Sequence, residues 1–225
     1  MRLVLLPGMN GSSTLFGPLL DALAGIDCQV INLPAKGLQD YHSLSEALYM
    51  QLGGTPFVLL GESFSGPLAY RLALRQPTGL RGVIFAASFL TRPNAALPLL
   101  RHLPMPLALA TQPWLLRALC LDKAADEEIL QRVQWEVLRL DQKLLRARLA
   151  TLARLQAPTQ ALDLPCLHLW PLQDRLVASA AAERLPQFCS DIRQIRLNGP
   201  HFILQTQPKA CAEAIAEFMQ ELGAS

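Results

Sequence analysis

The sequence predicts an α/β fold in which a doubly wound, mostly parallel sheet carries a helical insertion. Short apolar runs of strand length alternate with helical patterns near both ends of the 225-residue chain. Strands that are apolar at nearly every position are typical of parallel sheets with helices on both faces, and right-handed crossovers make such a sheet doubly wound. Between residues 91 and 155 the alternation stops, and a Leu- and Arg-rich helical pattern replaces it.

The composition is that of a globular chain and argues against several classes of function. Hydrophobic residues make up 51% and charged residues 17%, which is enough apolar surface for a two-sided core. A net charge of +2 without a basic run argues against a nucleic-acid partner. No apolar run is long enough to span a membrane, and the first one ends at Pro7 and Gly8, too early for a secretory signal.

Cysteine usage gives the expected compartment. The five cysteines are scattered and lack metal-binding spacing. We therefore expect reduced thiols in the cytoplasm, with neither a metal nor an organic cofactor.

Six apolar runs are expected to be strands: residues 2–6, 28–33, 56–60, 80–86, 165–170 and 192–197. Several of them end where a proline or glycine follows, as at Pro34 and Gly61. Helical periodicity predicts helices at residues 14–24, 43–52, 64–75, 178–185 and 208–222. Ser43 is expected to be an N-cap, because Glu46 three residues later would complete a capping box.

The insertion at residues 91–155 divides the chain into a core, residues 1–90 and 156–225, and a helical cap. Prolines interrupt its first part, and residues 126–155 form either one long helix or two in succession. A helical apolar stripe runs through Ile129, Val133, Val137 and Leu140. The alternative to a cap is a set of extra helices packed on the flank of the core.

Residues 57–68 combine a buried strand, a turn of small residues and a helix, with Gly61, Ser63 and Ser65 in the turn. The pattern differs by one residue from the Gly-x-Ser-x-Gly nucleophile elbow. Such a turn lifts the serine hydroxyl above the sheet edge and aims a helix N-terminus at the developing negative charge. We predict that Ser63 is a nucleophile, the alternative being a strand, turn and helix without chemistry.

Asp174 and His201 are predicted to complete a catalytic triad with Ser63. A serine becomes a useful nucleophile when a histidine takes its proton and a carboxylate orients that histidine. The order serine, acid, histidine, with each residue in a loop after a strand, is one known arrangement. These three residues follow three predicted strands in that order, and the carboxyl ends of parallel strands meet at one edge of a sheet.

Other candidates at these positions fit less well. Asp163 and Asp191 precede strands, which places them at the opposite edge. His168 lies within an apolar strand and is expected to be a core residue, while Glu62 is expected to point to the other side of the backbone from the nucleophile. Ser65 is the alternative nucleophile, but the elbow is centred on Ser63. His42 opens a predicted helix and is expected to be solvated.

Over essentially its whole length the chain resembles the α/β-hydrolase superfamily. The resemblance is carried by residues 5–11, 61–66, 173–177 and 199–202. Within the superfamily the chain looks most like small capped bacterial carboxylesterases of the pimeloyl-ester esterase type. The resemblance implies an α/β-hydrolase fold that lacks the usual first hairpin, because the chain starts at what would be the family's third strand.

The resemblance also implies an oxyanion hole built from the backbone N–H groups of Met9 and Phe64. Fixed amide dipoles of this kind typically lower a barrier by a few kcal/mol. Pro7-Gly8 stands in for the family's usual His-Gly, and Ser65 for the last elbow glycine. Neither departure removes a catalytic group.

Side chains of the insertion are expected to select the substrate. The candidate pocket residues there are His102, Trp114 and Trp135, with plain packing as the alternative. Four arginines recur along its second part: Arg132, Arg139, Arg146 and Arg148. They either dock an acidic partner such as an acyl carrier or form a solvated helix face.

The predicted function is that of a cytoplasmic serine carboxylesterase that cleaves a small-molecule ester through an acyl-enzyme intermediate. The same triad also serves thioesterases, acyltransferases and carbon–carbon bond hydrolases. A ligand-binding protein on the same scaffold, without turnover, is the alternative from another class.

Overall fold

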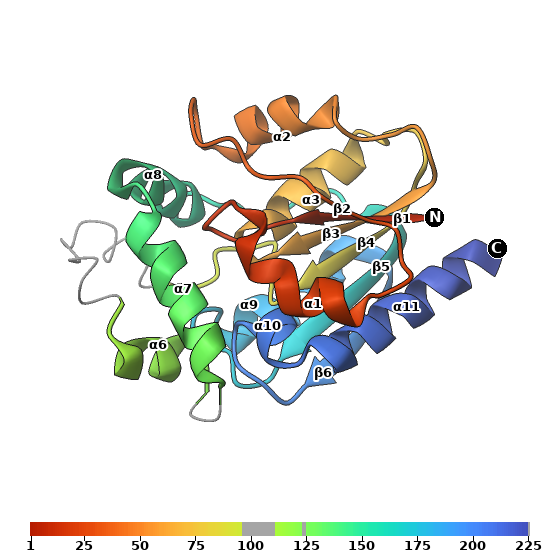
Figure 1. Ribbon diagram of the computed structural model, residues 1–225. Helices are drawn as coiled ribbons and strands as arrows, with labels where there is room; N and C mark the ends of the chain where they lie inside the picture. The colour runs from red at the N-terminus through yellow and green to blue at the C-terminus, as the bar shows by residue number, and fades with distance from the viewer. Residues whose placement is uncertain (96–110, 123–124, 225) are drawn as a thin grey trace.

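The sheet is the centre of the molecule. A computed structural model describes residues 1–95, 111–122 and 125–224 (Figure 1). Six strands form one sheet in the order β2-β1-β3-β4-β5-β6, and all five pairings are parallel. The strands are β1 (Arg2–Leu6), β2 (Cys28–Val30), β3 (Phe57–Glu62), β4 (Leu80–Ala86), β5 (Leu162–Pro171) and β6 (Cys189–Leu197).

All six predicted strands are therefore present, and their ends differ for identifiable reasons. The second strand ends at Val30 rather than at residue 33. The amide of Ile31 still donates to Leu5 O, but the amide of Leu33 donates to Gly11 O in the loop after β1. The fifth and sixth strands begin earlier than predicted, because they already pair at Leu162 and Cys189.

Helices cover both faces of the sheet, as the doubly wound prediction requires (Figure 1). Alternate residues of each strand point into two separate apolar clusters; Leu3 and Leu5 belong to one, Val4 and Leu6 to the other. Helices α1 (Gly17–Ala22), α10 (Ile203–Thr206) and α11 (Pro208–Ala224) pack on the first face. Helices α2 (Tyr41–Tyr49), α3 (Gly66–Leu74) and α9 (Ser179–Glu183) pack on the second.

Several helix boundaries correct the sequence-based expectation. The helix expected at residues 43–52 begins at Tyr41, and its N-cap is Asp40, whose carboxylate accepts from the Ser43 amide at 3.0 Å. Ser43 is thus the capped residue rather than the cap, and Glu46 pairs with Arg75 at 2.7 Å instead of closing a capping box. Three predicted helices begin or end as short 3-10 turns: η1 (Ser13–Phe16), η2 (Ser63–Ser65) and η3 (Leu185–Phe188).

The described part of the insertion contains α6 (Pro113–Leu119), α7 (Glu127–Arg139) and α8 (Gln142–Ala153). The stretch from 126 to 155 is two helices, because Leu140 is extended and Asp141 caps α8 by accepting from the Lys143 and Leu144 amides. Figure 1 shows the three helices together at one end of the sheet. Helices α6 and α7 meet the core over a small apolar cluster that contains Leu130 and Val133, and Leu152 of α8 belongs to one of the two large clusters.

None of the helices that the structure describes combines the length and the apolar character needed to cross a membrane.

Candidate active site

The turn after β3 has the strained geometry of a nucleophile elbow. Ser63 has a φ of 47°, in the left-handed region that a serine occupies only when its surroundings enforce it. A Cβ on Gly61 would lie 2.5 Å from Ser65 O, and one on Gly66 would overlap Ser88 Oγ. The elbow therefore depends on glycine at both positions, and Ser88, in the loop after β4, holds it by donating to Ser63 O at 2.8 Å.

The three residues predicted as a triad lie together. His201 Nε2 is 2.9 Å from Ser63 Oγ, and His201 Nδ1 is 2.7 Å from Asp174 Oδ2. Asp174 Oδ1 accepts from the amides of Leu176 and Val177 at 2.8 and 2.9 Å, so the carboxylate is fixed from both sides. With the proton on Nδ1, the imidazole is oriented to accept the Ser63 hydroxyl proton at Nε2.

The electrostatics of His201 suit a general base. Burial by itself lowers the pKa of His201, but the charge and hydrogen bond of Asp174, with a further contribution from Glu62, outweigh it and raise the pKa above 6.5. An imidazolium at this position is thereby stabilised.

Glu62 lies in the wall of the cavity that contains Ser63, although the sequence pattern placed it on the other side of the backbone. Its carboxylate is 5% exposed, and burial raises its pKa despite hydrogen bonds from Gln205 and Gly8. Gly8 N donates to Oε2 at 3.1 Å and Gln205 Nε2 donates to Oε1 at 2.8 Å. Glu62 therefore ties the loop after β1 to the elbow.

The loop after β1 is held at nearly every peptide around Met9. Ser65 Oγ donates to Pro7 O, Gly11 N donates to Gly8 O at 3.0 Å, and Arg148 Nη1 donates to Met9 O at 2.6 Å. No acceptor for the Met9 amide is found in the described part of the chain. This is the arrangement expected of an oxyanion donor, and the predicted pairing of the Met9 and Phe64 amides stays a prediction.

The cavity at Ser63 has a volume of about 190 Å³. Apolar side chains from the core and from the insertion make most of its wall: Leu15, Leu116, Val133, Val137, Leu140, Leu145, Leu176 and Phe202. The acidic side chains among the described residues of the wall are Glu62 and Glu136. The cavity is therefore suited to an uncharged, apolar group and unsuited to a second anion.

Glu136 of α7 also lies in that wall, and it is not among the site residues predicted from the sequence. It is 8% exposed and accepts hydrogen bonds from Asn10 Nδ2 at 3.0 Å and from Ser12 Oγ. It lies on the same helix stripe as Val133 and Val137, which is the signal that would have placed it in the site.

Trp114 and Trp135, two of the three predicted pocket residues, do not line this cavity. Trp135 is 48% exposed, and its ring lies under the Arg139 guanidinium at 4.1 Å. Trp114 is 63% exposed and lines a second, larger cavity. His102 falls outside the described residues.

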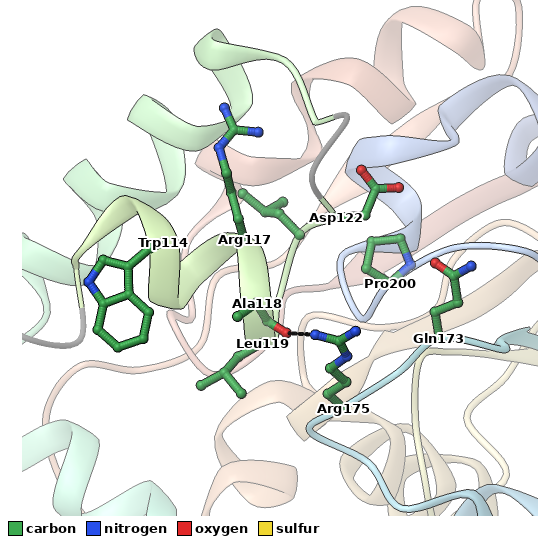
Figure 2. A pocket seen from close by; sticks show the side chains of 9 residues that line it. Trp114, Arg117, Ala118, Leu119, Asp122, Gln173, Arg175 and Pro200 are labelled. Carbon is green, nitrogen blue, oxygen red and sulfur yellow. Dashed lines mark hydrogen bonds between the residues drawn. The ribbon is translucent and has the colours of Figure 1, made fainter.

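This second cavity, about 590 Å³, lies between α6 and the loops that carry Asp174 and His201. Figure 2 shows Arg175 reaching across it to α6, where its Nη1 donates to Ala118 O at 2.6 Å. Gln173, Arg175 and Pro200 flank the triad residues in sequence and line this cavity, but the triad side chains do not. We therefore assign the chemistry to the smaller cavity, which contains both Ser63 and His201.

Two further titratable residues are inert for the chemistry. Burial lowers the pKa of His168 to about 4, and its Nδ1 lies 3.1 Å from Gln194 Nε2, which agrees with the predicted core role. Cys120 lines the active-site cavity, where burial, with the charge of Asp174, raises the pKa of its thiol to about 12. Cys120 is therefore a neutral thiol and no rival to the serine.

The chain belongs to the alpha/beta hydrolase family, whose sequence model matches residues 3–214. No curated protein matched it in a sequence search.

Solved structures agree on the fold. A thermophilic esterase from Thermogutta terrifontis is 16% identical, with 99% of this chain and 90% of that chain covered and a TM-score of 0.79. The enol-lactonase of Burkholderia xenovorans LB400 is 14% identical (97% and 91% covered, TM-score 0.81). The type II thioesterase BorB of the borrelidin biosynthetic cluster is 21% identical (97% and 92% covered, TM-score 0.70). These similarities establish an α/β-hydrolase fold.

Proposed function

We propose that this protein is a serine hydrolase that cleaves uncharged carboxylic esters through an acyl-enzyme intermediate. The observation that carries the proposal is the continuous hydrogen-bonded series from Ser63 Oγ through His201 to Asp174, with distances of 2.9 and 2.7 Å. This series opens into an apolar cavity of about 190 Å³. Nucleophile, base and orienting carboxylate stand in the relation that acyl transfer requires.

The reaction follows from the roles of these groups. Ser63 Oγ attacks the ester carbonyl while its proton passes to His201 Nε2, and the imidazolium is stabilised by Asp174. The oxyanion of the tetrahedral intermediate accepts hydrogen bonds from the Met9 and Phe64 amides. His201 then protonates the leaving alcohol. In the second half it takes a proton from water as the water attacks the acyl-enzyme, and it returns that proton to Ser63 Oγ as the acid leaves.

The substrate class follows from the walls of the cavity. Its apolar lining selects an alkyl or aryl group, and the carboxylates of Glu62 and Glu136 disfavour a substrate that brings a second negative charge. The esterase and the enol-lactonase among the structural neighbours share the fold that this proposal requires.

The five cysteines Cys28, Cys120, Cys166, Cys189 and Cys211 are free thiols, which fits the proposed working location in a reducing cytoplasm.

The test is labelling with a fluorophosphonate probe, mapped by peptide mass spectrometry. We expect a single labelled site at Ser63, no labelling in Ser63→Ala and steeply reduced labelling in His201→Ala. Ser65→Ala is unsuitable as a control because the Ser65 hydroxyl donates to Pro7 O. Ser179→Ala, on α9 and outside the lining of the cavity at Ser63, serves as the matched serine control. Labelling that survives Ser63→Ala would overturn the proposal.

Paired oxygen esters and thioesters of the same acyl group then separate the ester from the thioester function. We expect the p-nitrophenyl esters to show an optimum at short acyl chains, because the cavity is small. A kcat/KM that favours the thioester, after correction for its chemical reactivity, would transfer the assignment to a thioesterase on the same triad.

A further inference from the structure

Arg148 is a fully buried cation in the cap, contrary to the expectation that it belongs to a solvated helix face. It is 0% exposed, whereas Arg132, Arg139 and Arg146 are exposed. No carboxylate lies within ion-pair distance of it in the described residues. Burial lowers its pKa to about 10, so it remains charged at neutral pH. A buried charge without a counter-ion is costly unless hydrogen bonds replace its water.

Three neutral oxygens replace that water. Nε donates to Gln39 Oε1 at 3.0 Å, Nη1 to Met9 O at 2.6 Å and Nη2 to Pro34 O at 3.1 Å. Two of these acceptors are backbone carbonyls at the carboxyl edge of the sheet, and one of them belongs to the residue whose amide is the proposed oxyanion donor. Arg148 is thus directed at the backbone of the oxyanion loop.

The loop is a four-residue turn from Gly8 to Gly11, closed by the hydrogen bond from Gly11 N to Gly8 O at 3.0 Å. In a trans peptide the C=O and N–H point in opposite directions. The bond to Gly8 O therefore aims the N–H of Met9, which belongs to the same peptide, away from the turn. Arg148 binds Met9 O, the carbonyl of the central peptide of the turn. This peptide, between Met9 and Asn10, is the one that rotates when such a turn changes type.

Gly11 is shaped to receive this guanidinium. Its φ is +74°, and a Cβ at this position would lie 2.5 Å from Arg148 Nη1 and 2.9 Å from Nη2. The side chain from α8 therefore fills the space that an ordinary residue at the end of the turn would occupy. The turn and the arginine are fitted to each other.

We propose that Arg148 is a positioning residue for the oxyanion hole, through which cap helix α8 fixes the turn that presents the Met9 amide. This inference rests on the proposed hydrolase function. It also connects substrate binding with catalysis, because Leu145, three residues earlier on α8 and on the same helix face, lines the active-site cavity. One helix thus contacts the substrate group with one side chain and the oxyanion loop with another.

The test compares Arg148→Met and Arg148→Lys with Arg146→Met, an exposed arginine of the same helix. In Arg148→Met we expect kcat to fall by about tenfold to a hundredfold, somewhat less than the loss of a whole oxyanion donor, while KM stays within about twofold. Lysine supplies one donor to Met9 O and should recover part of the loss. Arg146→Met should behave as the wild type.

A tetrahedral analogue distinguishes positioning from a general loss of structure. An alkyl trifluoromethyl ketone places an oxyanion in the hole, so its inhibition constant should rise by the same factor by which kcat/KM falls. A ground-state competitor, the corresponding alkyl alcohol, should bind unchanged. A folded Arg148→Met protein with wild-type kcat and wild-type ketone affinity would overturn the inference.

A double-mutant cycle keeps the inference testable if Arg148→Met does not fold. Gly11→Ala should lower kcat more in the wild-type chain than in the Arg148→Lys chain. The backbone strain of alanine at position 11 is the same in both chains, and only the wild-type chain has a guanidinium for the new methyl group to contact. Additive effects would contradict the proposed fit. If instead the wild-type Ser63 is not labelled by fluorophosphonate, the hydrolase proposal itself fails, which is a separate outcome.

Discussion

The sheet edge and the cap hold their functional groups by different means. Ser63, Asp174 and His201 follow β3, β5 and β6, strands anchored by parallel ladders and by the two large apolar clusters. The cap has a much smaller apolar cluster against the core.

Instead, polar bonds join the cap to the loops after β1, β5 and β6. Arg148 and Glu136 bind the loop after β1, Arg175 in the loop after β5 donates to Ala118 O, and Phe202 N, next to His201, donates to Cys120 O at 3.1 Å. Under the proposed function, activation of the nucleophile depends on the core, whereas the fit of the substrate depends on the cap. Substitutions in the two regions should therefore have separable effects.

The largest expected effect is in the core. Asp174→Asn removes the strongest of the interactions that raise the pKa of His201. It also favours the imidazole tautomer that cannot accept the Ser63 proton at Nε2, so kcat for ester hydrolysis, measured by steady-state kinetics, should fall by about 10⁴-fold.

The pH dependence of the wild type tests the raised pKa of His201. His201 must be neutral to accept the Ser63 proton, so kcat/KM should fall as the pH drops through a pKa above 6.5. The pH–rate profile of the wild type checks this expectation; an acid limb centred below pH 6.5 would contradict the raised pKa.

Equal truncations in the two regions should differ in their cost to stability. Leu60 in the sheet and Leu130 in the cap are 0% and 1% exposed. Leu60→Ala should lower the free energy of unfolding by about 3 kcal/mol or more, because the surrounding sheet cannot close the cavity. Leu130→Ala should lower it by about half as much, since the small cap cluster relaxes more easily. Chemical denaturation measures both, and equal losses would remove the distinction between the regions.

Charge selectivity should reside in the cap. Glu136→Gln removes a carboxylate from the cavity wall but keeps an oxygen that accepts from Asn10 and Ser12. Relative to an uncharged ester of equal length, kcat/KM for an ester with a terminal carboxylate should rise by about tenfold, or about 1.4 kcal/mol. Glu128→Gln, on the exposed face of the same helix, is the matched control. An unchanged ratio in Glu136→Gln would show that this carboxylate does not select against anions.

The smallest effect is expected on the outer face of the cap. Arg132 forms an exposed i,i+4 ion pair with Glu128 at 2.7 Å. Arg132→Ala should change the free energy of unfolding by less than about 0.5 kcal/mol and should leave ester hydrolysis unchanged. A selective loss of activity on carrier-bound acyl substrates would instead assign this face to the docking of an acidic partner.

The sheet and the positions of the triad residues were predictable because they depend on local patterns. Each strand is a compact apolar run, and the topology of a parallel sheet brings the residues after such runs to one edge. The order of Ser63, Asp174 and His201 thus sufficed to place all three at that edge. Their mutual contacts, 2.9 and 2.7 Å, are consistent with the chemistry inferred from residue type alone.

The cap side of the site was not predictable to the same degree. A small error in the predicted rotation of a helix about its axis changes which side chains face the cavity and which face solvent. Trp135 and Glu136 are neighbours, yet the charged residue faces the cavity and the aromatic one faces solvent. A helix that begins after Asp141 as N-cap places Arg148 between Leu145 and Leu152 on the inner face of α8. Its partners, Met9 O and Pro34 O, are backbone atoms brought together only by the tertiary fold.

The place where the cap enters the chain has a consequence for how freely it can change. It interrupts the connection between β4 and β5, which pair directly in the sheet, so residues 87–161 form a loop whose ends the sheet itself brings together. The entropy lost on closing a loop grows only with the logarithm of its length, at about 0.6 kcal/mol for each doubling. Changes in the length of this segment therefore add little to the free energy of assembling the sheet, provided that Ser88 keeps its bond to the elbow and Leu152 its place in the core. A chain built in this way can gain or lose residues between those contacts while the folding of its sheet is almost unaffected.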